Sequence, residues 1–488
     1  NPARSLPVWL HDAGYRTALI GKYMNGYPAP DAIPYIPPGW DVWSVRYRAK
    51  PYDGQYNYWL NENGKSVYYG NKPEHYSTDV YRKKAVAFIK ETVNPMSEEF
   101  RRLGENKADI WSYAPGQLEV LEKAKDQAKK EGLWNFFLPN AETGEGLSNL
   151  DYAYIAVELG KNPMSSEVMN CAAPDTGNME VLERVGTPAQ KKQWLEPLLR
   201  GEIRSAFAMT EPDLASSDAK NIALEARHDG HEYVMNGEKY YISGAGDPRC
   251  KIMIVMCQTN SEGPVNSRQS QILVPMDTPG VKVLGPMNVF GNPDAPHGHM
   301  HIRFTDVRVP EENMLLGEGR GFEISQLRLG PGRIHHCMRA IGQAEKALDL
   351  MVSRGLTRVA FGKPIIQLGG NLEIISKCRI EIEAMRLMVL KAAKAMDVLG
   401  NREARVWIHM VKAMVPERVC RIIDEAIQMH GATGVSQWSP LAQMYTSQRT
   451  LRIADGPDAV HHMVVGRNEM NNYQPQEIDP SLAAVFRR

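Results

Sequence analysis

Two short segments hold residue types that suit chemistry. Residues 210–218 read TEPDLASSD and bring hydroxyl and carboxyl side chains together. Such side chains serve turns and helix caps, and they equally suit hydrogen bonding to a polar cofactor. Residues 454–458 read ADGPD and break an otherwise helical stretch with a Gly-Pro pair. A carboxylate there is either a cap for the next helix or a positioned general base. For both segments the residues alone leave the structural and the functional interpretation open.

Other motifs are weaker. Residues 317–321 (GEGRG) resemble a phosphate-binding glycine loop, but they lack the βαβ setting and the acidic residue on the next strand, so a linker is expected. His297, His299 and His301 alternate without an acidic or Cys neighbour in the sequence, so we expect no metal site. The chain has no G-x-S-x-G and no H-E-x-x-H.

The composition is that of an ordinary globular protein. A length of 488 residues corresponds to about three domains. Lys plus Arg and Asp plus Glu are both 57, so no net charge attracts the chain to nucleic acid or to an anionic membrane. The six Cys form no C-x-x-C and suggest reduced thiols. No apolar run approaches the ~18 residues of a membrane span.

The elements that must position these segments follow from hydrophobic periodicity. Helical patterns cover residues 116–132, 149–161 and 188–200, strand-like patterns fill 205–310, and long helices cover 333–470. In one long helix, apolar residues from Leu372 to Leu399 recur every three or four positions and predict one buried face. The front of the chain differs, because twelve of the 20 Tyr lie before residue 82.

Four motifs in order make residues 85–475 resemble the acyl-CoA dehydrogenase family. They are AMTEP…SD at 208–218, the strand EKYYISGA at 238–245, R-x-x-FGKP at 358–364 and Q-x-x-GATG at 428–434. The segments TEPDLASSDAKN and GPGRIHHCMR resemble sequences of the family branch that in animals is fused to a kinase domain. The resemblance implies an α+β multidomain fold with a helical domain (85–207), a middle β domain (208–320), a C-terminal helical bundle (321–475) and a tail (476–488).

Residues 1–84 resemble a sulfatase instead. The stretch LPVWLHDAGYRT at 6–17, followed by Gly21-Lys22-Tyr23, carries the resemblance, which implies that Lys22 contacts a sulfate. The nucleophile motif and the metal-binding acidic residues of that family are absent, so this N-terminal piece is incomplete. We therefore expect residues 1–84 to be dispensable for a dehydrogenase.

The dehydrogenase resemblance implies an FAD-dependent enzyme that oxidises a fatty acyl-CoA thioester across Cα–Cβ. A base removes the α-proton while the β-hydrogen leaves as hydride to the flavin. The base maps to Asp455, where most members carry Glu, and the substrate-binding positions map to Arg333 and Ser217. The implied cofactor-binding positions are Met209, Thr210, Tyr241, Ser243, Arg358, Phe361, Gln428 and Gly431. A sulfatase-derived hydrolase fusion and a non-catalytic flavin or acyl-CoA binder remain the alternatives.

The resemblance also implies partners. Arg358 and Gln428 map to positions that reach a neighbouring subunit's FAD, so a homodimer or homotetramer is expected. Acyl-CoA is the expected substrate and electron-transfer flavoprotein the expected electron acceptor. The expected compartment is the cytoplasm in a bacterium or an organelle matrix in a eukaryote.

Overall fold

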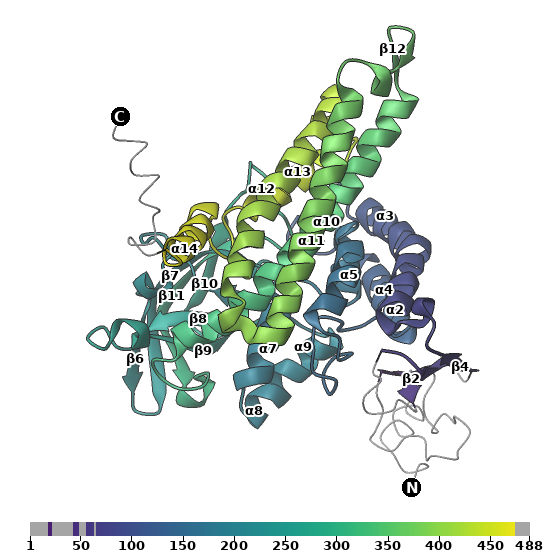
Figure 1. Cartoon of the computed structure of the whole chain (residues 1–488). Helices are drawn as coiled ribbons and strands as arrows, with labels where there is room; N and C mark the ends of the chain where they lie inside the picture. Colours follow the sequence, from purple (N-terminus) through teal and green to yellow (C-terminus); the bar gives the residue numbers. More distant parts are fainter. Residues whose placement is uncertain (1–17, 22–41, 48–54, 63–64, 474–488) are drawn as a thin grey trace, which may run out of the picture. The chain divides into compact units, whose positions relative to one another are not determined.

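The computed structural model describes residues 18–21, 42–47, 55–62 and 65–473. The chain divides into two compact units, Asn1–Gly332 and Arg333–Arg488. Figure 1 colours the chain from purple at the N-terminus to yellow at the C-terminus. Each unit is described by itself.

A small sheet opens the first unit. Its strands β1 (Ala18–Gly21), β2 (Val42–Tyr47), β3 (Tyr58–Glu62) and β4 (Lys65–Tyr69) lie in that order, with β1 and β2 parallel and the other pairs antiparallel. Lys22 lies outside the described residues, as does most of the sulfatase-like stretch, so that resemblance stays a prediction.

The boundary expected between residues 84 and 85 falls inside helix α2 (Ser77–Phe88). Val80 of α2 packs with Tyr58 and Leu60 of β3. Thr78 donates to the buried Asp151 carboxylate at 2.9 Å, which ties α2 to α5. Residues 77–84 therefore belong to the helical domain, and the expectation that residues 1–84 are dispensable loses its basis.

The remaining helices of this domain include the three that periodicity predicted. The predicted helices 116–132 and 149–161 are confirmed as α4 and α5, and 188–200 is a nearly continuous helical run from α8 to α9. The bounds are α3 (Asn94–Leu103), α4 (Gln117–Lys130), α5 (Asn149–Gly160), α6 (Pro163–Val168), α7 (Asp175–Val185), α8 (Pro188–Gln190) and α9 (Glu196–Arg200).

The predicted strand region is a seven-stranded sheet. Its order is β10-β11-β7-β6-β8-β5, and β9 pairs with β8. The pairs β5–β8 and β6–β8 are parallel and the rest antiparallel. Buried side chains such as Met253, Ile302 and Phe304 form its core. The bounds are β5 (Arg204–Ala208), β6 (Glu225–Asp229), β7 (Glu232–Ser243), β8 (Cys250–Gln258), β9 (Gln269–Pro275), β10 (Val281–Pro286) and β11 (His299–Pro310).

Two of the three alternating histidines lie close to acidic side chains. The Nε2 of His301 lies 2.6 Å from Glu238 Oε2, and that of His299 lies 3.7 Å from Asp294 Oδ2, while His297 precedes β11. His299 and His301 thus face two different carboxylates. Within the described residues, no three His, Cys, Asp or Glu side chains converge as a metal site.

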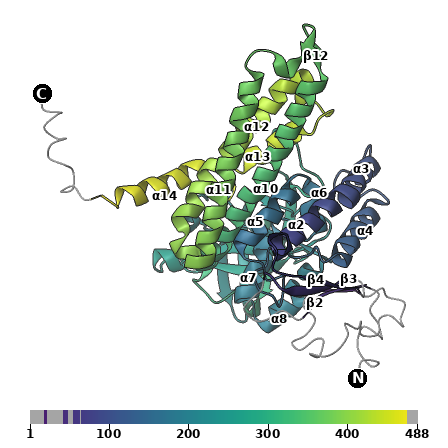
Figure 2. The same cartoon turned by 45° about the vertical axis from the view of Figure 1, so that its right-hand side comes forward.

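Long helices build the second unit. Helix α10 (Gly321–Thr357) crosses the boundary between the units, and a two-stranded hairpin, β12 (Val359–Ala360) and β13 (Lys363–Pro364), follows it. The bundle continues with α11 (Asn371–Glu403), α12 (Arg405–His430), α13 (Leu441–Thr450) and α14 (Asp458–Met470). Figures 1 and 2 show α11 and α12 side by side. They are antiparallel, because the chain leaves the helical conformation at Gly400, whose φ is +79° and ψ 168°, and turns back into α12.

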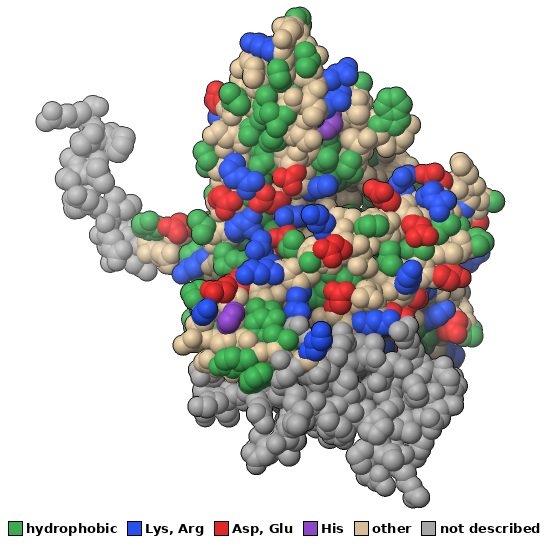
Figure 3. Space-filling view, turned by 90° about the vertical axis from the view of Figure 1, so that its right-hand side faces the viewer, with side chains coloured by type: hydrophobic (Ala, Val, Ile, Leu, Met, Phe, Trp, Pro, Cys, Tyr) green, Lys and Arg blue, Asp and Glu red, His purple; other side chains and the backbone are tan. Residues whose placement is uncertain are grey.

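The buried face predicted for α11 is correct only in its middle. Ile382, Met385 and Ala392 are buried, but Leu372 is 63% and Leu399 54% exposed. Leu372 lies in the first turn of α11, and Leu399 directly precedes the break in helical geometry at Gly400. Figure 3 shows positive and negative side chains interspersed over one face, in keeping with the balanced charge. No helix among the described residues is long and apolar enough to cross a membrane.

Candidate active site

Asp455 lies at a sharp turn between α13 and α14. Its φ is +56° and that of Gly456 is +104°, both in the left-handed region. Asp enters this region more readily than most residues, and Gly does so without strain. Pro457 then precedes α14, which begins at Asp458. The DGP triplet therefore reverses the chain and presents the Asp455 side chain between two helices.

Arg333 and His336 of α10 contact this turn. The Nε of Arg333 donates to the Asp455 carbonyl at 2.9 Å. The Nε2 of His336 lies 3.3 Å from Asp455 Oδ2. The structure therefore brings the expected substrate-binding Arg333 to the expected base. Sequence reasoning missed His336, although its position three residues after Arg333 places both on one helix face.

The protonation of His336 follows from its surroundings. Burial lowers the pKa of His336 below its ordinary value, although Asp455 opposes the shift, so the ring is neutral near pH 7. Arg339 lies 3.4 Å from Nδ1 and can only donate. Nδ1 is therefore the acceptor of the neutral ring, and Nε2 carries the proton. His336 thus donates a hydrogen bond to the Asp455 carboxylate.

Asp458 is the competing carboxylate of the same segment. It is the first residue of α14, and its Oδ2 lies 2.7 Å from the Nε of Arg452. This carboxylate is neutralised by a guanidinium and lies at the positive end of a helix dipole. The Asp458 carboxylate is thus already engaged by Arg452, which leaves Asp455 as the candidate base.

The TEP motif is fixed at the end of β5. The Glu211 carboxylate accepts hydrogen bonds from the Lys239 ammonium at 2.7 Å and from the backbone N–H of Leu224 at 2.8 Å. The Lys239 side chain is fully buried. Lys239 also donates to the Met209 carbonyl at 2.8 Å. Thr210 donates its hydroxyl to the Tyr240 carbonyl. Residues 209–211 are therefore held by β7 on one side and by residues 223–224 on the other.

The other middle-domain positions lie nearer the surface. Tyr241 is 46% exposed, with φ at +55°, and Ser217 is exposed. The Ser243 hydroxyl lies 2.8 Å from Nδ1 of His299, its neighbour in the register of β7 and β11. Met209 packs against the buried Met256 cluster. These expected cofactor positions all belong to the first unit.

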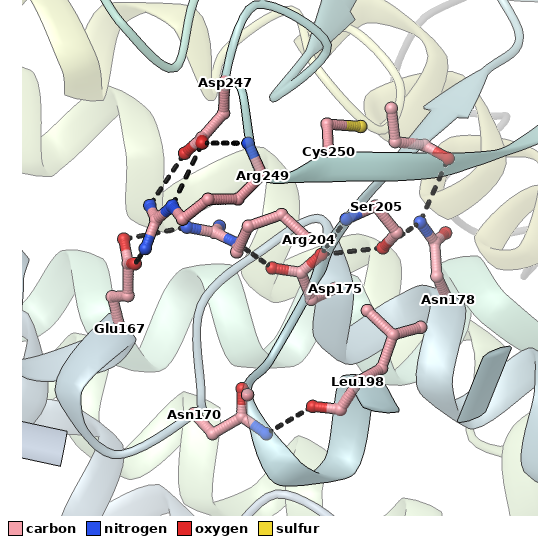
Figure 4. Close-up of polar contacts among 12 residues, drawn as sticks. Glu167, Asn170, Asp175, Asn178, Leu198, Arg204, Ser205, Asp247, Arg249 and Cys250 are labelled. Carbon is pink, nitrogen blue, oxygen red and sulfur yellow. Dashed lines mark hydrogen bonds and ion pairs between the residues drawn. The ribbon is translucent and has the colours of Figure 1, made fainter. Parts of the chain in front are cut away.

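A buried ionic network surrounds the start of β5 (Figure 4). Asp175 accepts the backbone N–H and the hydroxyl of Ser205, each at 2.7 Å, and pairs with Arg204. Glu167 bridges Arg204 and Arg249 at 2.7 Å each. Burial alone would raise the pKa of Glu167, but the two guanidinium groups outweigh it and keep that pKa below its ordinary value. Sequence reasoning missed this network, which anchors the strand that leads to Thr210.

The remaining positions gather at one end of the second unit. Phe361 and Gly362 form the two-residue turn of the β12–β13 hairpin, both with positive φ, and Phe361 is 94% exposed. Gln428 lies in the last turn of α12, which ends at Gly431. Since α11 and α12 are antiparallel, Arg358 on the hairpin and Gln428 lie at the same end of the bundle. The structure thus groups Arg358, Phe361, Gln428 and Gly431, apart from Asp455 and Arg333.

Comparison with known proteins decides the family. Models of the acyl-CoA dehydrogenase N-terminal, middle and C-terminal domains match residues 77–202, 206–307 and 319–470. FadE2 of Mycobacterium tuberculosis is 52% identical over 353 residues, which are 72% of this chain and 86% of its own length. This chain belongs to the acyl-CoA dehydrogenase family. Mouse acyl-CoA dehydrogenase family member 10 is 50% identical over 405 residues.

Solved structures agree with this acyl-CoA dehydrogenase fold. A Mycobacterium abscessus family structure aligns with a TM-score of 0.78 at 45% identity, covering 81% of this chain and 98% of its own. Butyryl-CoA dehydrogenase from Megasphaera elsdenii aligns with a TM-score of 0.67 at 27% identity, covering 80% and 98%. The fold neighbour glutaryl-CoA dehydrogenase of Mycobacterium smegmatis was solved with FADH2. The alignment with mouse family member 10 covers 82% of this chain but only 37% of the mouse protein's length.

Proposed function

We propose that this chain is an FAD-dependent oxidoreductase that removes the α-proton and the β-hydride of a fatty acyl-CoA thioester. The observation that carries the proposal is the Asp455 turn. The Asp455 backbone is in the left-handed region, its carbonyl accepts from Arg333, and its carboxylate accepts from the neutral His336. The second carboxylate nearby, Asp458, is already paired. A general base must be held within reach of the proton that it removes, and this turn holds one.

The residues present fit FAD. Arg358 is an exposed guanidinium and Gln428 an exposed amide at one end of the bundle, which suits the anionic oxygens of a diphosphate. Met209, Thr210, Tyr241 and Ser243 offer an apolar, an aromatic and two hydroxyl side chains, which suits a flavin ring. When bound, FAD accepts the hydride that leaves Cβ.

The chain's own residues supply the proton chemistry. Asp455 takes the α-proton at its carboxylate, and Arg333 holds the backbone of the same residue. Asp is one methylene shorter than the Glu of most members, which is about 1.5 Å of reach. We propose that the substrate's α-carbon sits correspondingly closer to the turn, with Ser217 and Arg333 contacting the acyl-CoA.

The spacing within the second unit supports an oligomer. Lys412 contacts the Asp455 turn, and Gln428 lies sixteen residues further along α12. This separation corresponds to about 24 Å of helix. We propose that the Arg358–Gln428 end serves the FAD of a neighbouring subunit in a homodimer or homotetramer. Electron-transfer flavoprotein is the proposed electron acceptor. Sedimentation of the flavin-loaded protein should therefore show activity only in the oligomer.

The test is an Asp455→Asn variant with Asp458→Asn as its control. Asn keeps the shape of the side chain but cannot accept the α-proton, so flavin bleaching by acyl-CoA should slow by about 10²–10⁴-fold. The variant should stay yellow and bind acyl-CoA, and Asp458→Asn should bleach at a rate close to that of the native protein. Bleaching by Asp455→Asn together with an inactive Asp458→Asn would contradict the proposal.

The same assay separates the alternatives. A wild-type protein that is yellow but is not bleached by any acyl-CoA would be a flavin binder without this activity. Cleavage of an aryl sulfate would favour the hydrolase fusion, for which the described residues offer no supporting contact.

A further inference from the structure

A single buried ammonium lies beneath the Asp455 turn. Lys412 of α12 is fully buried. Its Nζ donates to the carbonyl of Leu451, to that of Ala454 at 2.8 Å and to that of Gly456 at 3.4 Å. An ammonium has three N–H donors and no acceptor. The three carbonyls therefore take up its whole donor capacity.

Packing alone does not account for a lysine at this position. The residues beside it in α12, Val411 and Ala413, are buried and apolar, and a Met would fill the same space without a buried charge. Desolvation by burial lowers the pKa of Lys412, with Asp455 among the groups that oppose the shift. The carbonyl of Leu451 ends helix α13, where a cation is favourable. Lys412 is thus a costly side chain whose compensating partners all belong to one loop.

Those partners flank Asp455 directly. The Ala454 carbonyl belongs to the peptide before Asp455, and Arg333 holds the carbonyl of the peptide after it at 2.9 Å. The Gly456 carbonyl accepts both Lys412 and Nε2 of His461, the latter at 2.9 Å. Three consecutive peptide planes are therefore pinned by donors.

The histidine beneath the turn has a defined tautomer. Since Nε2 of His461 donates to the Gly456 carbonyl, its Nδ1 must accept from His409, whose Nδ1 lies 2.8 Å away. Burial lowers the pKa of His461 to about 3, so the ring is neutral near pH 7. Of the contacts that hold the turn, Lys412 alone makes three.

The backbone at Asp455 needs such support. A non-glycine residue in the left-handed region stores strain and persists only where its surroundings over-determine it. We propose that Lys412 is a positioning residue, which holds the Asp455 turn in its left-handed form and thereby aims the carboxylate at the α-proton. The proposal rests on the proposed function of Asp455. Lys412 acts through the backbone and touches neither substrate nor flavin.

The test is flavin reduction in Lys412→Met, with Lys394→Met on the exposed face of α11 as the matched control. FAD-loaded proteins are mixed with butyryl-, octanoyl- and palmitoyl-CoA, and the one that reduces the wild type fastest is used throughout. A misplacement of about 1 Å costs on the order of 10²-fold in rate. We expect Lys412→Met to be about 10- to 100-fold slower at saturating acyl-CoA, with its acyl-CoA dissociation constant within about twofold. Lys394→Met should match the wild type.

A double variant separates positioning from general stability. If Lys412 acts through Asp455, adding Lys412→Met to Asp455→Asn should cause no further slowing. Slowing that multiplies in the double variant would overturn the proposal, as would a wild-type rate in Lys412→Met. Lys412→Gln keeps amide donors and serves if the Met variant loses FAD. Loss of FAD in both would make Lys412 a stability residue and also overturn the proposal. A wild-type protein that no acyl-CoA bleaches would instead refute the proposed function.

Discussion

Replacing His336 with leucine should raise the apparent pKa of flavin reduction by about one unit. His336 is neutral near pH 7 and donates from Nε2 to the Asp455 carboxylate at 3.3 Å. This hydrogen bond stabilises the carboxylate and not the carboxylic acid. Removing the donor therefore makes Asp455 take up its proton at a higher pH.

The magnitude follows from the length of the contact. A hydrogen bond to a charged group contributes about 1.5–3 kcal/mol, and charge-assisted bonds are ordinarily 2.7–2.9 Å long. At 3.3 Å the lower end applies, about 1.5 kcal/mol. One pKa unit corresponds to about 1.4 kcal/mol, so the shift is about one unit upward. Arg333 and Lys412, the cations that face the turn, stay in place in the variant.

The assay is the rate of flavin bleaching at saturating acyl-CoA across the near-neutral pH range. Reduction needs the ionised carboxylate, so the fall in rate on acidification should begin about one pH unit earlier in His336→Leu. His336→Gln is the matched control, because its amide nitrogen can reach close to the position of Nε2 and still donate. His462→Leu on the exposed side of α14 controls for loss of an imidazole. An acid limb in His336→Leu that coincides with that of the wild type would refute the reasoning.

Three further outcomes test the scaffold. Glu211→Gln leaves the buried Lys239 ammonium without its anion and should lower the free energy of unfolding by about 3–5 kcal/mol. Adding Lys239→Met should recover most of this loss, and denaturant titrations measure both variants. A double variant as unstable as Glu211→Gln alone would contradict the ion-pair argument. Deleting residues 1–84 removes most of α2 with its bonds to Asp151, so the melting temperature should fall; an unchanged melting temperature would show that α2 contributes little. Acid should lower the free energy of unfolding between pH 6.5 and about 4, because the histidines of the unfolded chain take up protons in this range whereas the same histidines stay neutral in the folded protein. An equal free energy of unfolding in urea at both ends of this range would contradict a contribution from these histidines. Burial lowers the pKa of these histidines to about 4 for His297 and His409 and to about 3 for His461.

The helices and strands could be predicted from the local sequence wherever one face of the element is buried along its length. The periodicity predicted α4, α5, the β region and the centre of α11 correctly, because burial there repeats with the period of the element. It failed at the ends of α11, where Leu372 and Leu399 fit the apolar pattern but are exposed. The boundary at residue 84 came from the two family resemblances and not from periodicity, and it falls inside one helix.

The sequence by itself determined that the base segment turns. An Asp-Gly-Pro triplet between two helical runs has to turn, and Asp and Gly tolerate the left-handed backbone that the turn requires. The four motifs indicated the fold class through the family resemblance, and the three domain models match the chain in the expected order.

Only the tertiary structure decided what surrounds Asp455. Arg333 and His336 lie more than a hundred residues earlier in the chain, and Lys412 lies on a different helix. Their convergence depends on how α10 and α12 pack against the turn. The hydrophobic periodicity does not predict this packing, because Lys412 and His336 lie on the inward-facing sides of their helices, where the pattern expects apolar residues. The turn is a local property of three residues, whereas the donors that hold it come from helices distant in sequence.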